Sequence, residues 1–133
     1  MFAAVKSQSR ILIVDRSILA GNLYRILFSK LGAALLVRRR FEDAKPTFSR
    51  RERIDLAIFN SNAFGKKFDE IFDALGSDGA LGRARKIFLL KEGDAEKDWR
   101  KKLEGIEGAL IVDRPFHPDE FAKAVEGMLG GAR

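Results

Sequence analysis

The sequence predicts a single α/β domain in which five parallel strands alternate with five helices. Three observations lead to this fold class: short apolar runs without polar alternation, apolar residues at helical spacing between those runs, and glycine or proline at the joints. Uninterrupted apolar runs are typical of strands buried on both faces of a parallel sheet. A chain of 133 residues, 46% of them hydrophobic, suffices for one such core. We therefore expect a three-layer (βα)5 architecture with right-handed crossovers.

The first two strands flank the most regular of the predicted helices. The first strand is the apolar run at residues 11–14, and Ser17 is a candidate N-cap for the helix that follows. That helix is predicted from apolar residues at helical spacing: Leu19, Leu23, Ile26, Leu27 and Leu31. Gly32 supplies a left-handed end. The second strand is predicted at residues 34–37, before a run of three arginines.

The middle of the chain predicts an irregular helix, a strand and a phenylalanine-rich helix. Residues 41–53 carry many charges and Pro46, which we expect in a first helical turn. Residues 54–59 form the third apolar run, and a polar loop follows at 60–62. The next helix is predicted from five apolar residues spaced three and four apart: Phe64, Phe68, Ile71, Phe72 and Leu75.

The last third of the chain repeats the strand-helix pattern twice. Residues 76–82 contain three glycines and predict a flexible connection, after which residues 87–90 form the fourth strand. Asp94 is a candidate cap for a helix that carries Trp99 and Leu103. The fifth strand is residues 109–112. The final helix begins at Pro118 and is predicted from an apolar face: Phe121, Val125, Met128 and Leu129.

These boundaries define one domain at residues 10–130, with an N-terminal extension at 1–9 and a short tail at 131–133. The longest apolar stretch has seven residues, whereas a membrane-spanning helix needs about 20, and residues 1–9 lack the apolar centre of a secretory signal. We therefore expect a cytoplasmic protein that makes no contact with membranes.

Composition excludes several kinds of chemistry. The chain has no cysteine, which excludes disulfides, thiolate metal sites and a cysteine nucleophile, and its only histidine is His117. No glycine-rich phosphate loop is present, so neither a dinucleotide nor a P-loop site is indicated. Without a nucleophile-base pair or a cofactor motif, we expect no enzyme activity and no cofactor.

Candidate functional residues follow the strands, because ligands of open parallel sheets bind beyond the carboxyl ends of the strands. The charged and polar residues at these positions are Asp15, Arg16, Asn60, Lys91, Glu92 and Arg114. Two interpretations of such a cluster remain open. Its cations and anions pair with one another and hold the loops together, or the surplus positive charge binds an anion.

Three segments together resemble the receiver domain of response regulators, the CheY-like domain of two-component signalling. They are Ile-Leu-Ile-Val-Asp at 11–15, Asp-Leu-Ala-Ile-Phe-Asn at 55–60, and Arg-Pro-Phe at 114–116 with Pro-Asp-Glu at 118–120. The resemblance covers residues 10–129. It implies the flavodoxin-like sheet order 2-1-3-4-5 and a role in bacterial signal transduction.

The resemblance also implies which residues form the phosphorylation pocket. A working receiver holds Mg²⁺ with two adjacent acids after strand 1, and it is phosphorylated on an Asp after strand 3. A hydroxyl residue after strand 4 and a Lys after strand 5 complete the pocket. Carried over, Asp15 keeps the first acid and Arg16 replaces the second. Asn60 replaces the phosphoacceptor, Lys91 the hydroxyl and Arg114 the Lys.

Four of these five positions depart from the pattern, so the chain resembles a degenerate pseudo-receiver that lacks the phosphoacceptor Asp. An amide is a poor nucleophile, and Arg16 would oppose a divalent cation, so we expect no Mg²⁺ and no phosphorylation. Ile111 stands where receivers usually carry an aromatic switch residue. In place of the metal, Arg16 or Arg114 is expected to pair with Asp15.

Partners are predicted to be signalling proteins. Receivers generally bind them through the helix 4, strand 5, helix 5 face, which the resemblance assigns here to Lys97, Arg100, Lys101, Ile111 and Lys123. The formal net charge of +6 favours a partner with an acidic surface and salt-sensitive association. The alternative is an anion- or nucleic-acid-binding protein that uses the basic surface, including the runs at 38–40 and 50–53, although such runs are usually solvated.

Overall fold

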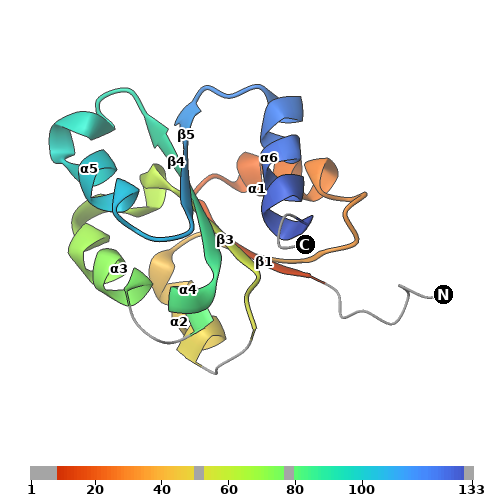
Figure 1. Cartoon of the computed structure of the whole chain (residues 1–133), viewed down its shortest axis with the longest axis horizontal. Helices are drawn as coiled ribbons and strands as arrows, with labels where there is room; N and C mark the ends of the chain where they lie inside the picture. Colours follow the sequence, from red (N-terminus) through yellow and green to blue (C-terminus); the bar gives the residue numbers. More distant parts are fainter. Residues whose placement is uncertain (1–8, 50–52, 77–79, 131–133) are drawn as a thin grey trace.

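A five-stranded parallel sheet forms the centre of the computed structural model, which describes residues 9–49, 53–76 and 80–130. The strands are β1 (Arg10–Val14), β2 (Ala34–Arg38), β3 (Leu56–Asn60), β4 (Arg85–Lys91) and β5 (Ala109–Arg114). Their order, β2-β1-β3-β4-β5, is the flavodoxin-like order expected from the sequence (Figure 1). The carboxyl ends of β1 and β3 lie side by side, with Val14 opposite Phe59.

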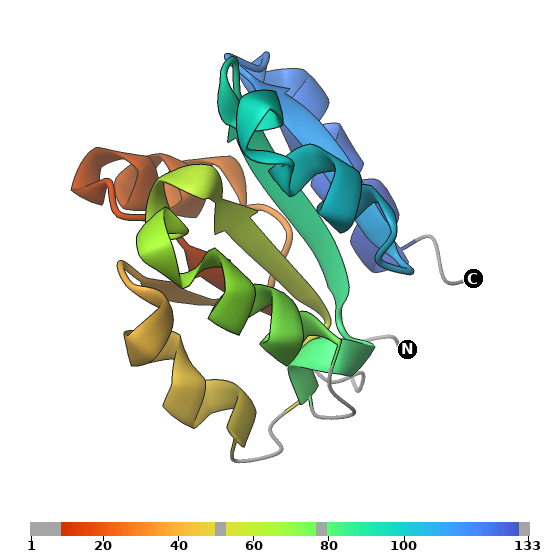
Figure 2. The same cartoon turned by 90° about the vertical axis from the view of Figure 1, so that its left-hand side faces the viewer.

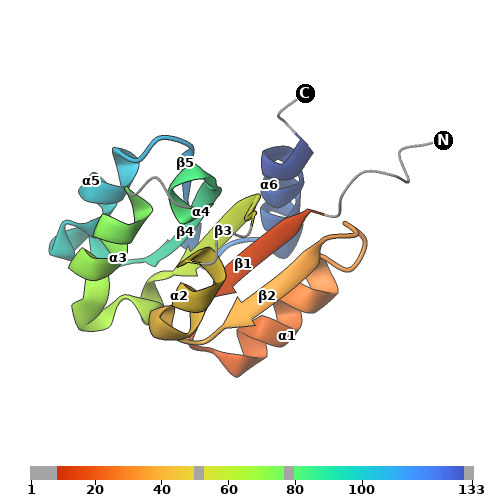
Figure 3. The same ribbon diagram turned by 90° about the horizontal axis from the view of Figure 1, so that it is seen from below.

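Helices cover both faces of the sheet. They are α1 (Ile18–Leu27), α2 (Phe41–Ser49), α3 (Phe68–Leu75), α4 (Ala80–Arg83), α5 (Trp99–Glu104) and α6 (Pro118–Gly130). Helices α1 and α6 lie on one face (Figures 1 and 3), and Figure 2 shows α2, α3 and α5 on the other. Three 3-10 turns interrupt the loops: η2 (Ser61–Ala63), η3 (Gly65–Lys67) and η4 (Asp94–Lys97).

The described residues contain six α-helices, one more than the sequence predicts. The extra helix, α4, lies in the connection expected to be flexible, where Leu81 is buried. A segment of four residues with one large apolar side chain leaves no periodicity to detect. Residues 1–8 and 131–133, which belong to the predicted extension and tail, lie outside the described residues, as do Arg50 and Arg51.

Each face of the sheet has its own aromatic core. Between the sheet and α3 and α5, the Trp99 ring lies 5.1 Å from Phe64 and 5.4 Å from Phe68. Between the sheet and α1 and α6, the Phe28 ring lies 5.8 Å from that of Phe121. Strands β1, β3 and β4 are buried almost throughout, whereas the edge strands β2 and β5 are half-buried because each has a neighbour on one side only.

Helix α1 buries only part of the face that its aliphatic spacing suggests: Leu27 and Leu31 are half-buried against the core, whereas Leu19, Leu23 and Ile26 are exposed. The helix is confirmed, and the Ser17 hydroxyl caps it by accepting a 3.1 Å hydrogen bond from the Ala20 amide. Its buried residues, however, are Gly21 and Tyr24. It ends at Leu27, before Gly32, which has the expected positive φ of 68°.

Two local predictions are wrong. Pro46 lies in the interior of α2, not in its first turn. There its ring nitrogen has no hydrogen to donate, and this loss is confined to one position of a short helix. Asp94 does not cap α5. Its buried carboxylate accepts a 2.8 Å hydrogen bond from the Lys91 amide and closes the turn after β4, while Asp98 precedes α5 with a φ of 60°.

Lys86 is buried although the sequence gives no reason to expect it. Only 1% of the residue is exposed, and its Nζ donates to the carbonyls of Ala84 at 2.6 Å and Gly82 at 3.1 Å. Burial lowers the pKa of the Lys86 ammonium. Within the described part of the chain, no helix is both long and apolar enough to span a bilayer.

The ring cluster between α1 and α6 predicts a large cost for truncating Phe121. Its side chain is 1% exposed and contacts the rings of Phe28 and Phe116. We expect Phe121→Ala to lower the free energy of unfolding by about 3–5 kcal/mol, because it removes buried surface and leaves a cavity. The control Leu110→Ala changes an exposed residue of β5 and is expected to cost below about 1 kcal/mol. Urea denaturation of both variants measures the difference, and equal costs would contradict this assignment of the core.

Candidate functional site

The Asp15 side chain lies fully buried at the carboxyl end of β1 and accepts four hydrogen bonds. Oδ1 accepts from the Ser17 amide at 2.9 Å and from Asn62 Nδ2 at 2.8 Å. Oδ2 accepts from the Tyr24 hydroxyl at 2.6 Å and from Asn60 Nδ2 at 2.9 Å. All four donors are neutral, so the carboxylate is stabilised by dipoles and not by an ion pair.

The fold brings these donors together from three neighbouring segments. Asn60 ends β3, which pairs directly with β1, so its amide faces the residue after β1. Asn62 follows in η2, where its backbone N–H donates to Asn60 Oδ1 at 3.1 Å. Tyr24 reaches the site from the buried face of α1, and the Ser17 amide belongs to the N-cap of the same helix. One carboxylate thus connects β1, α1 and the β3 loop.

The predicted pairing of Asp15 with Arg16 or Arg114 is wrong. No ion pair joins the Asp15 carboxylate to either arginine in the described residues. Arg16 binds the site through its backbone, since its N–H donates to Asn62 Oδ1 at 3.0 Å while its side chain is exposed. Arg114 Nη2 donates to the buried Ser61 hydroxyl at 2.9 Å. The hydrogen bonds to the Asp15 carboxylate come instead from neutral donors.

The two remaining members of the predicted pocket lie outside this network. Lys91 and Glu92 are exposed, and the Lys91 amide is held by Asp94 in the turn after β4. Gly93 has a φ of 97°, so the backbone turns immediately after these two residues. The structure therefore brings Asp15 and Asn60 into direct contact. Arg114 binds Ser61, the residue that follows Asn60. Lys91 and Glu92 lie at the surface.

Tyr24 is the residue that sequence reasoning missed. It is the only tyrosine of the chain, and it sits among aliphatic residues whose spacing drew attention away from it. Burial and the adjacent Asp15 carboxylate raise the pKa of the Tyr24 phenol, which therefore remains protonated and donates. One sequence signal could have identified Tyr24: it is a single polar aromatic residue in an apolar helix, seven residues after the N-cap.

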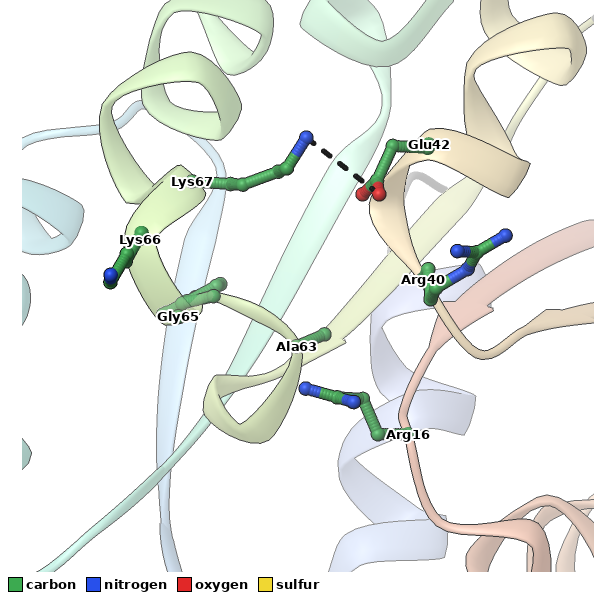
Figure 4. A pocket seen from close by; sticks show the side chains of 8 residues that line it. Arg16, Arg40, Glu42, Ala63, Gly65, Lys66 and Lys67 are labelled. Atoms are coloured by element: carbon green, nitrogen blue, oxygen red, sulfur yellow. Dashed lines mark ion pairs between the residues drawn. The ribbon is translucent and has the colours of Figure 1, made fainter.

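A basic hollow of about 310 Å³ opens beside this network and is drawn in Figure 4. The Arg16 side chain points toward Ala63 on one wall, whereas the Lys66 side chain points away. Two of the surrounding cations have acidic partners: Lys67 lies 3.7 Å from Glu42, and Arg40 lies 3.1 Å from Asp43. The hollow is basic, but much of its charge is already compensated.

The predicted partner face is divided by β5. Lys97, Arg100 and Lys101 lie in η4 and α5, on the side of the sheet where Ile111 packs against the core. Lys123 is exposed on α6, which covers the other side. Charge on this face is partly compensated, since Arg100 pairs with Asp113. The Lys97 ammonium lies 4.6 Å from the centre of the Trp99 ring, a cation–π contact that leaves its charge uncompensated.

Solved structures with this architecture include several receiver domains. The signal receiver domain of an HD domain-containing protein from Pseudomonas fluorescens Pf-5 has a TM-score of 0.78 and 18% identity, covering 98% of this chain and 93% of its own. The chemotaxis response regulator CheY4 of Vibrio cholerae has a TM-score of 0.74 and 18% identity, covering 92% and 100%. The fold is that of a receiver domain.

A response regulator receiver protein from Burkholderia phymatum has the receiver fold as well, with a TM-score of 0.67 and 23% identity over 92% of this chain and 96% of its own. No protein-family model matches the sequence, and the search of curated proteins finds no match. The likeness is thus one of fold.

The hydrogen bond from Tyr24 to Asp15 predicts a measurable loss of stability on removal of one hydroxyl. Tyr24→Phe retains the ring that packs 6.2 Å from Phe28. We expect the free energy of unfolding to fall by about 1.5–3 kcal/mol, the usual contribution of a hydrogen bond to a charged group. In an Asp15→Ala background the same change should cost far less, because the acceptor is absent. Additive effects in this double-mutant cycle would contradict the bond.

The raised phenol pKa of Tyr24 predicts a loss of stability in alkali. A tyrosine in the unfolded chain ionises near pH 10, whereas Tyr24 in the folded protein holds its proton to higher pH. The stabilisation is therefore complete below about pH 10 and decreases above it by up to about 1.4 kcal/mol per pH unit. Unfolding measured at about pH 9 and about pH 11 should show a steeper decline for the wild type than for Tyr24→Phe. Parallel declines would show that the phenol does not titrate differently on folding.

Proposed function

We propose that this chain is a non-phosphorylatable receiver domain that acts as a protein-binding module in bacterial two-component-type signal transduction. The observation that carries the proposal is the 2.9 Å hydrogen bond from Asn60 Nδ2 to the Asp15 carboxylate. In the resemblance to receivers, Asn60 occupies the phosphoacceptor position and Asp15 that of a metal ligand. In this protein the two side chains bind each other.

The residues of the site do not fit the Mg²⁺ that receivers hold. A carboxylate offers about four lone-pair positions, and Asp15 has four donors directed at its two oxygens. Mg²⁺ requires hard anionic oxygens, yet Arg16 follows Asp15 where a second acid would stand. No group of three His, Cys, Asp or Glu side chains suited to a metal occurs in the described part of the chain.

Asn60 is also unsuited to phosphotransfer. Its Nδ2 donates to Asp15 while its Oδ1 accepts from the Asn62 amide, so both polar atoms are engaged in holding the loop. An amide is in addition a poor nucleophile toward phosphorus. The proposed module is therefore not an enzyme, needs no cofactor and holds one conformation of the site without a phosphoryl group.

The proposed partners are signalling proteins with acidic surfaces. The candidate face around α5, β5 and α6 offers the exposed cations Lys101 and Lys123. A protein with a net charge of +6 associates faster with an acidic partner, in a salt-sensitive manner. Localisation in the cytoplasm belongs to the same proposal.

Binding of a small anion is the second candidate function, and the hollow beside Arg16 is the observation that favours it. The guanidinium of Arg16 makes no ion pair in the described residues, and Arg39 Nε donates to the Arg16 carbonyl at 3.2 Å nearby. The pairs Lys67 with Glu42 and Arg40 with Asp43 reduce the charge that an anion would meet. We therefore rank this function second.

A non-phosphorylatable site predicts no response to phosphoryl donors. Incubation with acetyl phosphate and Mg²⁺ should leave the intact mass unchanged, and beryllofluoride should leave the ¹H–¹⁵N spectrum unchanged, because Asn60 lacks a nucleophile. A mass gain of one phosphoryl group at any strand-end residue would overturn the proposal.

Substitutions that restore the acids serve as a matched control. The double variant Arg16→Asp, Asn60→Asp returns two carboxylates to the site, but Tyr24 and Asn62 still donate to Asp15. Adding Tyr24→Phe releases one lone pair of Asp15 Oδ2. We expect Mg²⁺-induced shifts in the spectrum to be stronger in the triple variant than in the double one, and absent in the wild type.

A further inference from the structure

The hollow beside Arg16 is lined in part by a backbone turn of a kind that binds anions. Phe64 has right-handed dihedral angles, with φ −72° and ψ −58°, and Gly65 has a positive φ of 50°. A right-handed residue followed by a left-handed one directs successive backbone N–H groups to one side and forms a concave nest for an anion. Glycine suits the second position because residues with a Cβ rarely adopt a positive φ. Both residues line the hollow of about 310 Å³.

The Arg16 side chain points toward this turn from the loop after β1. Figure 4 shows its guanidinium directed at Ala63, the residue before Phe64. The backbone of Arg16 is held on both sides: its N–H donates to Asn62 Oδ1 at 3.0 Å, and its carbonyl accepts from Arg39 Nε at 3.2 Å. Its guanidinium makes no ion pair within residues 9–49, 53–76 and 80–130. The backbone is therefore fixed, while the guanidinium remains available to a ligand.

The charge around the hollow has a surplus that matches one phosphate group. Two of its lining cations, Lys67 and Arg40, have carboxylate partners at 3.7 Å and 3.1 Å. Two others, Arg16 and Lys66, have no ion pair in the part of the chain that the structure describes. A phosphate monoester carries about −1.5 to −2 charges near pH 7. Arginine also offers a planar fork of donors that fits phosphate oxygens, whereas Lys66 points away in Figure 4 and contributes only its electric field.

The hollow is separate from the hydrogen-bond network of Asp15. That carboxylate is fully buried, and both polar atoms of Asn60 are engaged, so neither side chain is free to bind a ligand. Among the described residues that line the hollow, the one carboxylate is that of Glu42, and the ammonium of Lys67 offsets its repulsion of an anion. An anion can therefore be bound here without any change at the strand ends.

We propose that the hollow binds a phosphate monoester, whose oxygens are held between the Arg16 guanidinium and the backbone N–H groups of Gly65 and Lys66. The inference rests on the anion-binding function ranked second above, and it names the class of the ligand. Free phosphorylated metabolites and phosphorylated side chains of proteins share this chemistry, and the test separates these two sources. A phosphodiester, as in nucleic acids, carries one negative charge and matches the surplus less well.

Two small phosphates test the proposal. The probe is O-phosphoserine, a monoester, and its counterpart is dimethyl phosphate, a diester. Each is titrated into the ¹⁵N-labelled full chain at equal ionic strength and without divalent cations, and binding is followed by ¹H–¹⁵N correlation spectra. We expect O-phosphoserine to shift the amide protons of Gly65 and Lys66 downfield, as a hydrogen bond to an anion does. It should bind at least about tenfold more tightly than dimethyl phosphate, because its charge is about twice as large.

Variants of Arg16 and a matched control locate the contact. Arg16→Gln removes an exposed guanidinium, so its thermal unfolding should match that of the wild type, while its affinity for O-phosphoserine should fall by about tenfold or more. Arg16→Lys keeps the charge without the fork and should lose part of the affinity. The control Lys30→Gln removes one charge from an exposed residue after α1, at the opposite edge of the sheet, and should change the affinity by less than about twofold.

A short peptide separates the two sources of the phosphate. It has about nine residues with one central phosphoserine, and its control is the same peptide without the phosphate. If the phosphopeptide binds at least about tenfold more tightly than O-phosphoserine, and the control peptide does not bind, the ligand is a phosphorylated protein. Equal affinities of the phosphopeptide and O-phosphoserine would assign the hollow to a free metabolite. Either result supports a monoester site.

Other outcomes overturn the inference in distinct ways. If neither O-phosphoserine nor dimethyl phosphate binds, the anion-binding function fails together with the inference. If the two bind equally, anion binding stands and the monoester inference fails. An equal loss of affinity in Arg16→Gln and Lys30→Gln would show attraction by net charge and no site. Shifts confined to α5 and β5 would place the anion on another surface.

Discussion

The buried carboxylate of Asp15 is the constraint on which the carboxyl edge of this sheet depends. An ionised group without water needs a full set of partners, because leaving it unpaired costs several kcal/mol. Four neutral donors meet that need here, and they come from the α1 N-cap, the middle of α1 and the loop after β3. The same four bonds that allow the charge to be buried therefore fix the positions of those segments.

In the proposed function, a fixed contact takes the place of a metal-dependent switch. In a receiver that binds metal, the ends of β1 and β3 supply oxygens to an exchangeable ion. In this chain the amide of Asn60 donates directly to Asp15, and the phenol of Tyr24 donates from the helix. Hydrogen bonds within the protein do not depend on a ligand concentration. The site is accordingly suited to a structural role, and Tyr24 also commits α1 to present its aliphatic side to the solvent.

Much of the fold could be predicted from the sequence, because the apolar runs of the buried strands and the apolar face of α6 are patterns formed by residues close together in the chain. Ile13 and Ile58 belong to apolar runs that remain core strands whichever neighbour they pair with. The site was less predictable. Asp15 and Asn60 were found because each follows a strand, but Tyr24 lies nine residues from Asp15 on a helix whose spacing pointed elsewhere. Lys91 and Glu92 follow a strand too, yet the turn at Gly93 directs them to the surface.

By itself, the sequence determined the strands and their alternation with helices, together with the amide at position 60 and the cation at position 16. These follow from side-chain type and short-range periodicity. The tertiary structure alone decided which groups contact Asp15 and which side of α1 is buried. Both depend on the rotation of a helix about its axis, and this is set by how Gly21 and Tyr24 fit against β2 and the strand ends. Amphipathic spacing does not fix that rotation when a helix has apolar residues on more than one face.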